Sequence, residues 1–334
     1  MATFVDLFCG IGGFHIAMAR QGMECVFACD IDEKARDVYR ANFGITPAGD
    51  ITQIESSRIP PHDVLCAGFP CQSFSVCGKR GGLDDPRGSL WYEVIRIAKY
   101  HKPKIILLEN VPNLLKIAGG RIFHDIETDL KCSIAPEGYS VYYKVLNSLD
   151  YGLTQCRKRL YVVCIRNDAK LGEKETLSVN WGKLGGRSNR NQKSVFDIRC
   201  PDGTEKDLTS KMSAEDLEQV KRKFEVPREW DGYLTKPERL GGIGGSTSQG
   251  MRIYSMAQSA VTLLSQGGGW GAKTGLYYDV SGKKPVVRTL SHTECKRLMT
   301  FPDTHIISEG ASGYKQLGNA VMPAMVMKVY GAIG

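Results

Sequence analysis

A cysteine that directly follows a proline is the side chain of this 334-residue sequence most suited to covalent chemistry. Cys71 ends the run Gly68–Phe69–Pro70–Cys71, in a predicted loop after the apolar residues Val64–Ala67. Proline fixes its own φ and restricts the residue before it, so the loop has little conformational freedom. A thiolate is a strong nucleophile, but an isolated cysteine is more often a small apolar core residue. Cys71 alone is therefore only a candidate nucleophile.

Two further groups extend this chemistry. Glu109 directly follows the apolar run Ile105–Leu108, and Arg157 lies just before another predicted strand, which begins at Arg159. Ligands of open α/β sheets bind at the carboxyl ends of parallel strands, so we expect Cys71 and Glu109 at the same edge. A thiolate that attacks, an acid that neutralises a ring nitrogen and a supporting cation are what conjugate addition to a heteroaromatic ring needs.

A glycine-rich turn predicts a nucleotide-like ligand. The first strand ends in Asp6–Gly13 and leads directly into a helix, a turn at which backbone can approach such a ligand. His15 replaces the third glycine of the dinucleotide pattern, so we expect a different adenosine ligand. Asp30 lies twenty residues after Gly10, where an acid can accept ribose hydroxyl hydrogen bonds. Asp50 offers a second carboxylate, suited to an exocyclic amine such as that of adenine.

The elements that must position these residues alternate between strand and helix patterns in the first half of the chain. This alternation predicts an α/β fold with a parallel sheet flanked by helices. The expected strands are Thr3–Phe8, Cys25–Cys29, Val64–Ala67, Ile105–Leu108, Val141–Leu146 and Arg159–Ile165. The expected helices are Phe14–Arg20, Glu33–Asn42, Gly88–Tyr100 and Arg121–Lys131.

The composition changes after Lys174. Between Glu238 and Asp279 the chain has ten glycines and no acidic residue. Such a stretch lets backbone amides and a few long side chains approach a polyanion closely. A flexible linker is the alternative, but Arg252–Tyr254 and Ala260–Leu264 are apolar and strand-like. We therefore expect ordered loops on a small β domain.

The composition is that of an ordinary globular protein, with 42% hydrophobic and 24% charged residues. The formal net charge of +8 is a moderate indication of a polyanionic partner. The N-terminus has no secretion signal and no apolar run is long enough to span a membrane, so we expect a cytoplasmic protein without membrane contact. The eleven cysteines are scattered and lack metal-site spacing, which predicts reduced thiols and no metal.

Six motifs in a fixed order carry a family resemblance. They are Phe8–x–Gly10–x–Gly12, Gly68–Phe69–Pro70–Cys71–Gln72, Glu109–Asn110–Val111, Gln155–x–Arg157–x–Arg159, Arg288–Thr289–Leu290 through Phe301–Pro302–Asp303, and Gly318–Asn319–Ala320–Val321. With these motifs the chain resembles the bacterial-type DNA (cytosine-5)-methyltransferases over nearly its full length. Within that family it is most similar to the short single-chain enzymes of the HhaI kind, which modify GCGC. The similarity continues into the variable region, at Gln249–Ser255 and Gly267–Gly269.

The resemblance implies a Rossmann-like S-adenosylmethionine-dependent methyltransferase sheet with helices on both faces, plus a smaller, mostly β target-recognition domain. Residues 1–180, completed by 304–334, would form the catalytic and cofactor-binding domain. Residues 181–303 would form the target-recognition domain and hinge. We expect a monomer that acts on double-stranded DNA, with any cognate restriction endonuclease acting independently.

The resemblance also assigns roles to single residues. The four implied catalytic residues are Cys71, Glu109, Arg157 and Arg159. Cys71 would add to C6 of a flipped-out cytosine while Glu109 holds and protonates N3. Contacts to S-adenosylmethionine, which leaves as S-adenosylhomocysteine, are implied for Phe8, Gly10, Ile11, Gly12, Gly13, Asp30, Ile31, Asp50, Ile51, Pro70, Leu90, Asn319, Ala320 and Val321. DNA contacts are implied for Gln72, Ser75, Cys77, Gln249, Arg252, Gly267 and Gly268, and no metal is implied.

Two alternatives use the same motifs. The first is the same chemistry on tRNA, but the Cys-Phe-Thr signature of that branch is absent from this sequence. The second is a catalytically inactive DNA-binding protein. Intact Cys71, Glu109 and Arg157, together with the cofactor loop, argue against it.

Overall fold

The computed structural model describes residues 1–70, 89–132, 134, 138–171, 175–185, 193–225, 236–246, 248–265 and 274–334. The chain forms two compact units. Unit 1 comprises Met1–Leu146, Lys158–Leu184 and Val321–Gly334, and unit 2 comprises Asn147–Arg157 and Gly185–Ala320. The functional domain limits expected from the sequence stay a prediction.

Unit 1 is built on a six-stranded sheet with the order β2-β1-β3-β4-β6-β5. The strands are β1 (Thr3–Leu7), β2 (Glu24–Cys29), β3 (Val64–Ala67), β4 (Ile105–Asn110), β5 (Tyr139–Asn147) and β6 (Lys158–Arg166). All six expected strands are therefore confirmed. β1 pairs in parallel with β2 and β3, and β3 in parallel with β4. The expectation of a wholly parallel sheet is wrong at β6, which runs antiparallel to β4.

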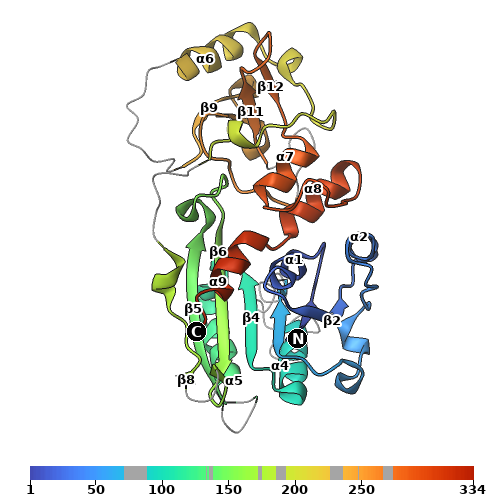
Figure 1. The fold of residues 1–334 in the computed structure, drawn as a ribbon. Helices are drawn as coiled ribbons and strands as arrows, with labels where there is room; N and C mark the ends of the chain where they lie inside the picture. The colour runs from blue at the N-terminus through green and yellow to red at the C-terminus, as the bar shows by residue number, and fades with distance from the viewer. Residues whose placement is uncertain are drawn as a thin grey trace. The chain divides into compact units, whose positions relative to one another are not determined.

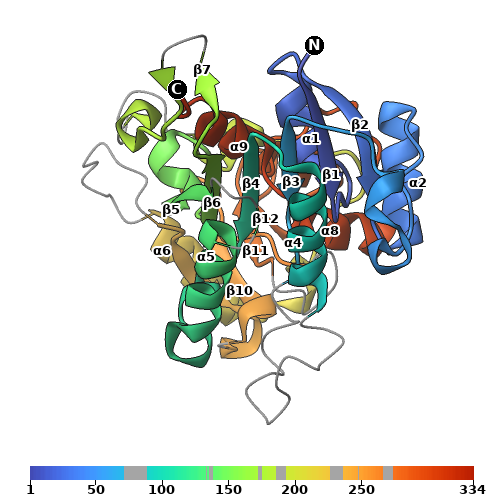
Figure 2. The same ribbon diagram turned by 90° about the horizontal axis from the view of Figure 1, so that it is seen from below.

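Helices cover both faces of this sheet, as expected. They are α1 (Gly13–Ala19), α2 (Glu33–Phe43), α4 (Ser89–His101), α5 (Arg121–Cys132) and α9 (Pro323–Tyr330). Figure 2 shows α4 and α5 on one face and α1 and α9 on the other. α4 buries the stripe Trp91, Val94, Ile95 and Ala98 against the sheet, where these side chains join one apolar core with Leu65 and Ile106. A strand pair formed by β7 (Lys170–Leu171) and β8 (Glu175–Thr176) also belongs to unit 1.

Unit 2 contains a four-stranded sheet with the order β12-β11-β10-β9. Its strands are β9 (Arg239–Gly242), β10 (Arg252–Ser255), β11 (Leu276–Asp279) and β12 (Val286–Arg288). The helix α6 (Ala214–Glu225) lies beside β9 (Figure 1), and Val220 of α6 shares an apolar core with Leu240, Ile253, Leu276 and Val287. Two further helices are α7 (His292–Leu298) and α8 (Gly310–Asn319).

Two sequence expectations for unit 2 have different outcomes. Arg252–Tyr254 is a strand, as predicted, because it forms most of β10. Ala260–Leu264 is not a regular strand. Its first residue forms an isolated bridge with Gln155, and its backbone bonds with residues 154–156 instead of extending the sheet.

None of the helices in the described part of the chain has the length and apolar character that crossing a bilayer requires.

Candidate active site and cofactor loop

The centre of the candidate active site is an ion pair between Glu109 and Arg159. Glu109 is the fifth residue of β4, and Arg159 is the second residue of β6. Because these strands run antiparallel, the carboxyl end of β4 lies beside the amino end of β6, with Glu109 opposite Tyr161. Arg159 Nε lies 3.0 Å from Glu109 Oε1, and both side chains are largely buried. The neighbouring strand therefore orients the carboxyl that the sequence marked as a proton carrier.

Asn110 ties this carboxyl to the predicted nucleophile loop. Its Nδ2 donates to the carbonyl oxygen of Phe69 at 3.0 Å, and its Oδ1 accepts from the amide of Val111 at 2.8 Å. Phe69 is itself buried and packs on the ring of Trp91, with 5.5 Å between ring centroids. The sequence motif contains Asn110, but no role was predicted for it. The sequence feature that could have indicated a role for Asn110 is its position next to Glu109 at the end of a strand.

Four of the residues predicted to act on DNA lie outside the described residues. These are Cys71, Gln72, Ser75 and Cys77. The described chain ends just before them at Pro70, which is exposed. Phe69, held by Asn110, is thus two residues from the predicted nucleophile.

Arg157 and Arg159 have different partners although they are only two residues apart. Arg157 is buried and belongs to unit 2. Its guanidinium donates to the carbonyl oxygens of Leu263 at 2.9 Å and of Gly318 and Ala320 at 3.1 Å each. Arg159 pairs with the carboxylate of Glu109. Of the two predicted catalytic arginines, the structure thus brings Arg159 to the carboxyl.

The glycine-rich loop after β1 has the conformation that a close backbone approach needs. Phe8, Gly10 and Gly12 have positive φ angles of 55°, 52° and 88°. A non-glycine residue at positive φ is uncommon, so Phe8 is held there by its surroundings. A Cβ on Gly12 would overlap the ring of Phe43, and one on Gly13 would overlap the carbonyl oxygen of Val321. Glycine is therefore favoured at Gly12 by its backbone conformation and by this contact, and at Gly13 by the contact alone.

Asp30 is joined to this loop by hydrogen bonds. Its carboxylate accepts from the amide of Gly10 at 2.8 Å and from that of Asp32 at 2.8 Å. Burial raises the pKa of Asp30, while these two amide bonds oppose the shift. The sequence spacing that suggested a ribose-binding acid thus corresponds to a direct contact between the acid and the glycine-rich loop.

Other predicted cofactor residues of unit 1 lie in the segment after β2 and at the start of α4. The amide of Asp30 donates to the carbonyl of Ala48 at 3.0 Å, which joins the segment before Asp50 to the end of β2. Asp50 accepts a hydrogen bond from the amide of Thr52 at 3.0 Å and is partly exposed. Ile51 is buried and Leu90 is partly buried. Ile31 is 75% exposed, which leaves an apolar side chain in solvent directly after Asp30.

The C-terminal motif is divided between the two units. Asn319 ends α8 and is exposed, and Ala320 follows it as a buried residue of unit 2. Val321 belongs to unit 1, where it lies against Gly13 and Gly68. Of these three predicted cofactor residues, Val321 lies beside the glycine-rich loop of its own unit. Asn319 and Ala320 belong to unit 2.

Two predicted DNA-contacting residues, Gln249 and Arg252, are described by the structure and lie in unit 2. Gln249 starts the short 3-10 helix Gln249–Met251, which leads into Arg252 at the start of β10. Gly267 and Gly268 lie outside the described residues. Arg239 Nη2 donates to the carbonyl of Ser246 at 3.0 Å, which holds the glycine-rich turn before Gln249.

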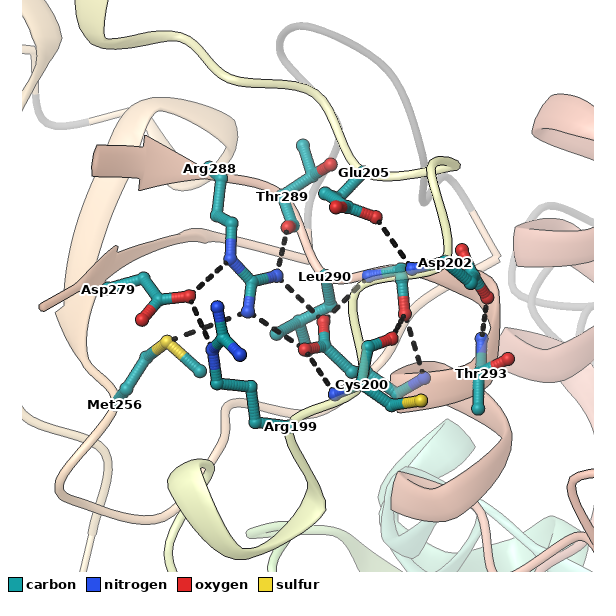
Figure 3. Close-up of polar contacts among 12 residues, drawn as sticks. Arg199, Cys200, Asp202, Glu205, Met256, Asp279, Arg288, Thr289, Leu290 and Thr293 are labelled. Atoms are coloured by element: carbon teal, nitrogen blue, oxygen red, sulfur yellow. Dashed lines mark hydrogen bonds and ion pairs between the residues drawn. The ribbon is translucent and has the colours of Figure 1, made fainter. Parts of the chain in front are cut away.

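A buried ion network that the sequence did not indicate organises unit 2 (Figure 3). The guanidinium of Arg288 lies 2.7 Å from Asp279 and makes two 2.8 Å hydrogen bonds to Glu294. Asp279 also accepts from Arg199 at 2.9 Å. Burial raises the pKa of Asp279, but hydrogen bonds from Ser281 and the two arginines outweigh burial and bring the pKa to about 2. The network thus joins β11, β12 and α7.

Glu294 also completes the start of α7. Ser291 and Glu294 form a reciprocal capping box, in which each side chain bonds the other residue's amide. Ser291 Oγ donates to the carbonyl of Cys200 at 2.7 Å, and the amide of Cys200 donates back to Glu294 at 3.0 Å. Within the described ranges, no group of three or more His, Cys, Asp or Glu side chains could hold a metal ion.

Comparisons with known proteins found a family model and relatives that match nearly the whole chain. A family model described as C-5 cytosine-specific DNA methylase matches residues 2–334. The type II methyltransferase M.HhaI of Haemophilus parahaemolyticus is 39% identical over 320 residues, which are 96% of this chain and 90% of that protein. The type II methyltransferase M.NgoBI of Neisseria gonorrhoeae is 36% identical over 96% of this chain and 89% of its own.

Solved structures share the fold at low sequence identity. The S. pombe Dnmt2 methyltransferase has a TM-score of 0.68 at 17% identity, covering 99% of this chain and 98% of its own. A putative DNA modification methyltransferase encoded within an E. coli prophage has a TM-score of 0.61 at 18% identity, covering 99% and 98% of the two chains.

Proposed function

The chain belongs to the C-5 cytosine-specific DNA methylase family, and we propose that it methylates C5 of a flipped-out cytosine in one short duplex sequence through a covalent Cys71 adduct. The family's reaction uses S-adenosylmethionine as the methyl donor. The observation that carries the mechanistic part is the link from Arg159 through Glu109 and Asn110 to the carbonyl of Phe69. A proton-carrying acid and the backbone of the nucleophile loop are thus held together.

The proposed steps follow from the chemistry of these groups. The Cys71 thiolate forms a bond to C6, and the ring electrons move toward C5 and N3. Glu109 holds and protonates N3, and Arg159 keeps the Glu109 carboxyl oriented. C5 then forms its bond to the methyl group. The C5 proton is lost to solvent, the thiolate departs from C6, and the N3 proton returns to Glu109, which restores the aromatic ring and regenerates Cys71 and Glu109. Because the reacting atoms are inaccessible in a stacked duplex, the cytosine must leave the helix.

The residues of unit 1 fit an adenosine ligand at the glycine-rich loop. The Asp30 carboxylate is held by two amides and retains lone pairs for ribose hydroxyl donors. Ile31, 75% exposed beside it, offers an apolar surface for one face of a base. Asp50 is partly exposed and can accept from an exocyclic amine. When bound, S-adenosylmethionine supplies an electrophilic methyl group and leaves as S-adenosylhomocysteine.

The target assignment is also part of the proposal. Gln249 would fill the space that the flipped cytosine leaves, and Arg252 would contact DNA next to it. We propose a short palindromic target that contains a CG step, with GCGC as the leading candidate. The enzyme would act as a monomer in the bacterial cytoplasm, either beside a cognate restriction endonuclease or alone. The relatives named as type II methyltransferases support this setting.

Methyl transfer from labelled S-adenosylmethionine tests the proposal. Duplex DNA with GCGC sites is compared with duplex DNA that lacks CG, with tRNA and with no substrate. We expect label only in the first DNA, and bisulfite sequencing of host DNA after expression maps the site. Label in tRNA alone would show that the substrate is RNA and not DNA. Methylation at a site without a CG step would refute the proposed target sequence.

Cys71→Ser tests the covalent step, because a serine hydroxyl is far less ionised than a thiol. It should abolish methyl transfer and leave DNA binding in place. Substantial turnover by this variant would remove the covalent adduct from the mechanism.

A further inference from the structure

The side chain of Arg157 is a buried junction of three chain segments. Nη1 donates to the carbonyl of Leu263 at 2.9 Å, and Nη2 donates to the carbonyls of Gly318 and Ala320 at 3.1 Å each. Only 3% of the residue is exposed. A planar guanidinium with fixed donor directions can serve several carbonyls at once, which a single ammonium cannot do in the same geometry. The position therefore needs arginine for its shape as well as its charge.

The segments that Arg157 joins are also bonded to each other. The amide of Cys156 donates to the carbonyl of Ala260 at 2.9 Å, and the amide of Ala260 donates to the carbonyl of Thr154 at 2.8 Å. Thr262 Oγ1 donates to the carbonyl of Cys156 at 2.6 Å. The junction thus has a rigid base, formed by residues 154–157 and 260–263, on which the guanidinium is fixed.

The third segment, Gly318–Ala320, is held to this base by Arg157 and by close packing. A Cβ on Gly318 would overlap the carbonyl group of Leu264 and the amide nitrogen of Ser265. The guanidinium binds the carbonyls on both sides of Asn319, so the backbone of Asn319 is fixed between two anchored residues. A change at either contact would free the same short segment.

This segment continues directly into Val321, which lies against the glycine-rich loop of unit 1. Gly13 leaves no room for a Cβ beside the Val321 carbonyl, and a Cβ on Gly68 would come within 3.2 Å of Val321 Cγ2. The anchored Ala320 is thus bonded to a residue that contacts both the cofactor loop and the strand end before Cys71.

We propose that Arg157 is a positioning residue for cofactor binding and does not touch the reacting base. Its three carbonyl contacts set the path of Gly318–Ala320, and through the peptide bond to Val321 they keep the glycine-rich loop in its binding conformation. This assignment rests on the proposed use of S-adenosylmethionine. It separates Arg157 from Arg159, whose partner is the carboxylate of Glu109.

Arg157→Lys and Arg159→Lys, compared in the full-length protein, test the proposal. For Arg157→Lys we expect cofactor KM and the Kd for S-adenosylhomocysteine to rise about tenfold, with kcat at saturating cofactor within about threefold of wild type. For Arg159→Lys we expect kcat to fall at least about tenfold with an almost unchanged Kd. The reverse split, in which Arg157→Lys lowers kcat at an unchanged Kd, would overturn the proposal.

A second variant of the same segment keeps the proposal testable if an Arg157 variant does not fold. Gly318→Ala disturbs the packing of the same segment against the backbone of Leu264 and Ser265. Like Arg157→Lys, it should therefore raise the Kd for S-adenosylhomocysteine. Lys315→Ala, exposed on the same helix α8, is the matched control and should bind like wild type. Added guanidinium ion should partly restore S-adenosylhomocysteine binding to Arg157→Ala and leave Gly318→Ala unchanged. Unchanged Kd values in both Arg157 variants would overturn the role.

The binding measurement also separates this inference from the proposed function. S-adenosylhomocysteine affinity is measured without DNA, so it is informative even if wild type methylates no DNA in the assay. If wild type does not bind S-adenosylhomocysteine, the proposed cofactor site is wrong and the role of Arg157 is overturned with it. If wild type and variant bind equally while wild type methylates DNA, only the role of Arg157 is overturned.

Discussion

The Nδ2 atom of Asn110 donates a hydrogen bond to the carbonyl oxygen of Phe69 at 3.0 Å. This contact joins the end of β4, which carries Glu109, to Phe69, forty-one residues earlier in the chain and two residues before Cys71. A nucleophile and a proton donor act together only when their relative position is maintained to within a fraction of an ångström. Asn110 is therefore the first residue to test.

Asn110→Asp keeps the size of the side chain and the acceptor for the amide of Val111 but removes the donor to Phe69. We expect kcat to fall at least about tenfold, because the nucleophile loop loses its anchor. Cofactor affinity should change little. Steady-state kinetics and S-adenosylhomocysteine titration measure the two effects. Asn113→Asp, at an exposed position nearby, is the control, and an equal loss in both variants would contradict the role of the Phe69 contact.

Glu109→Gln should lower the rate of methyl transfer by about 100-fold or more, because general acid–base catalysis contributes about that much. Glutamine cannot deliver the proton that the ring nitrogen needs as charge develops there. Single-turnover kinetics at saturating cofactor measure this step. A Glu109→Gln variant whose main defect is weaker S-adenosylhomocysteine binding would disprove the assignment. Glu127→Gln on α5 is a suitable control, since its ion pair with Lys131 lies on one helix.

Asp30→Ala should weaken cofactor binding without changing the methylated sequence. The carboxylate holds the amide of Gly10 and is proposed to accept ribose hydroxyl bonds, so its loss affects the loop and the ligand together. Isothermal titration with S-adenosylhomocysteine gives the affinity, and bisulfite mapping at saturating cofactor gives the site. Wild-type affinity in this variant would remove Asp30 from the cofactor site.

Arg252→Ala distinguishes base reading from phosphate contact. Arginine matches the O6 and N7 acceptors of guanine, and losing such a contact costs about 1–3 kcal/mol at the cognate site only. A phosphate contact would weaken binding to all sequences alike and lower the salt dependence. We expect the first pattern in binding assays with cognate and scrambled duplexes at two salt concentrations. Lys221→Ala, exposed on α6, provides the comparison, and an equal loss on both duplexes would exclude base reading.

Asp279 makes the stability of unit 2 depend on pH. Its folded-state pKa of about 2 lies below the ordinary value, so the carboxylate stabilises the fold above the unfolded-state pKa. This contribution, about 2 kcal/mol, is lost as the pH falls from about 4 towards 2. Urea unfolding at pH 6 and pH 3 should show a smaller pH effect in Asp279→Asn than in wild type. Equal pH effects would contradict the shift.

Local patterns were sufficient to predict the elements around the site. The apolar runs of β1 to β4, the helix stripe of α4 and the strand-end positions of Asp30 and Glu109 follow from side-chain periodicity and turn residues, which act over a few residues. The reversed direction of β6 was not predicted. An apolar strand pattern records which faces are buried and contains no information on the direction of the partner strand.

The sequence by itself determined the family, the alternating α/β order and the candidate nucleophile, acid and cofactor loop, because these depend on residue types at short spacing. Only the tertiary structure decided that Arg159 pairs with Glu109 while Arg157, two residues earlier, binds the carbonyls of Leu263, Gly318 and Ala320. It also decided that Asn110 holds Phe69. Each of these contacts joins residues that are more than forty positions apart in the sequence. Their geometry is set by the antiparallel pairing of β4 with β6 and by the packing of α8, which no local pattern specifies.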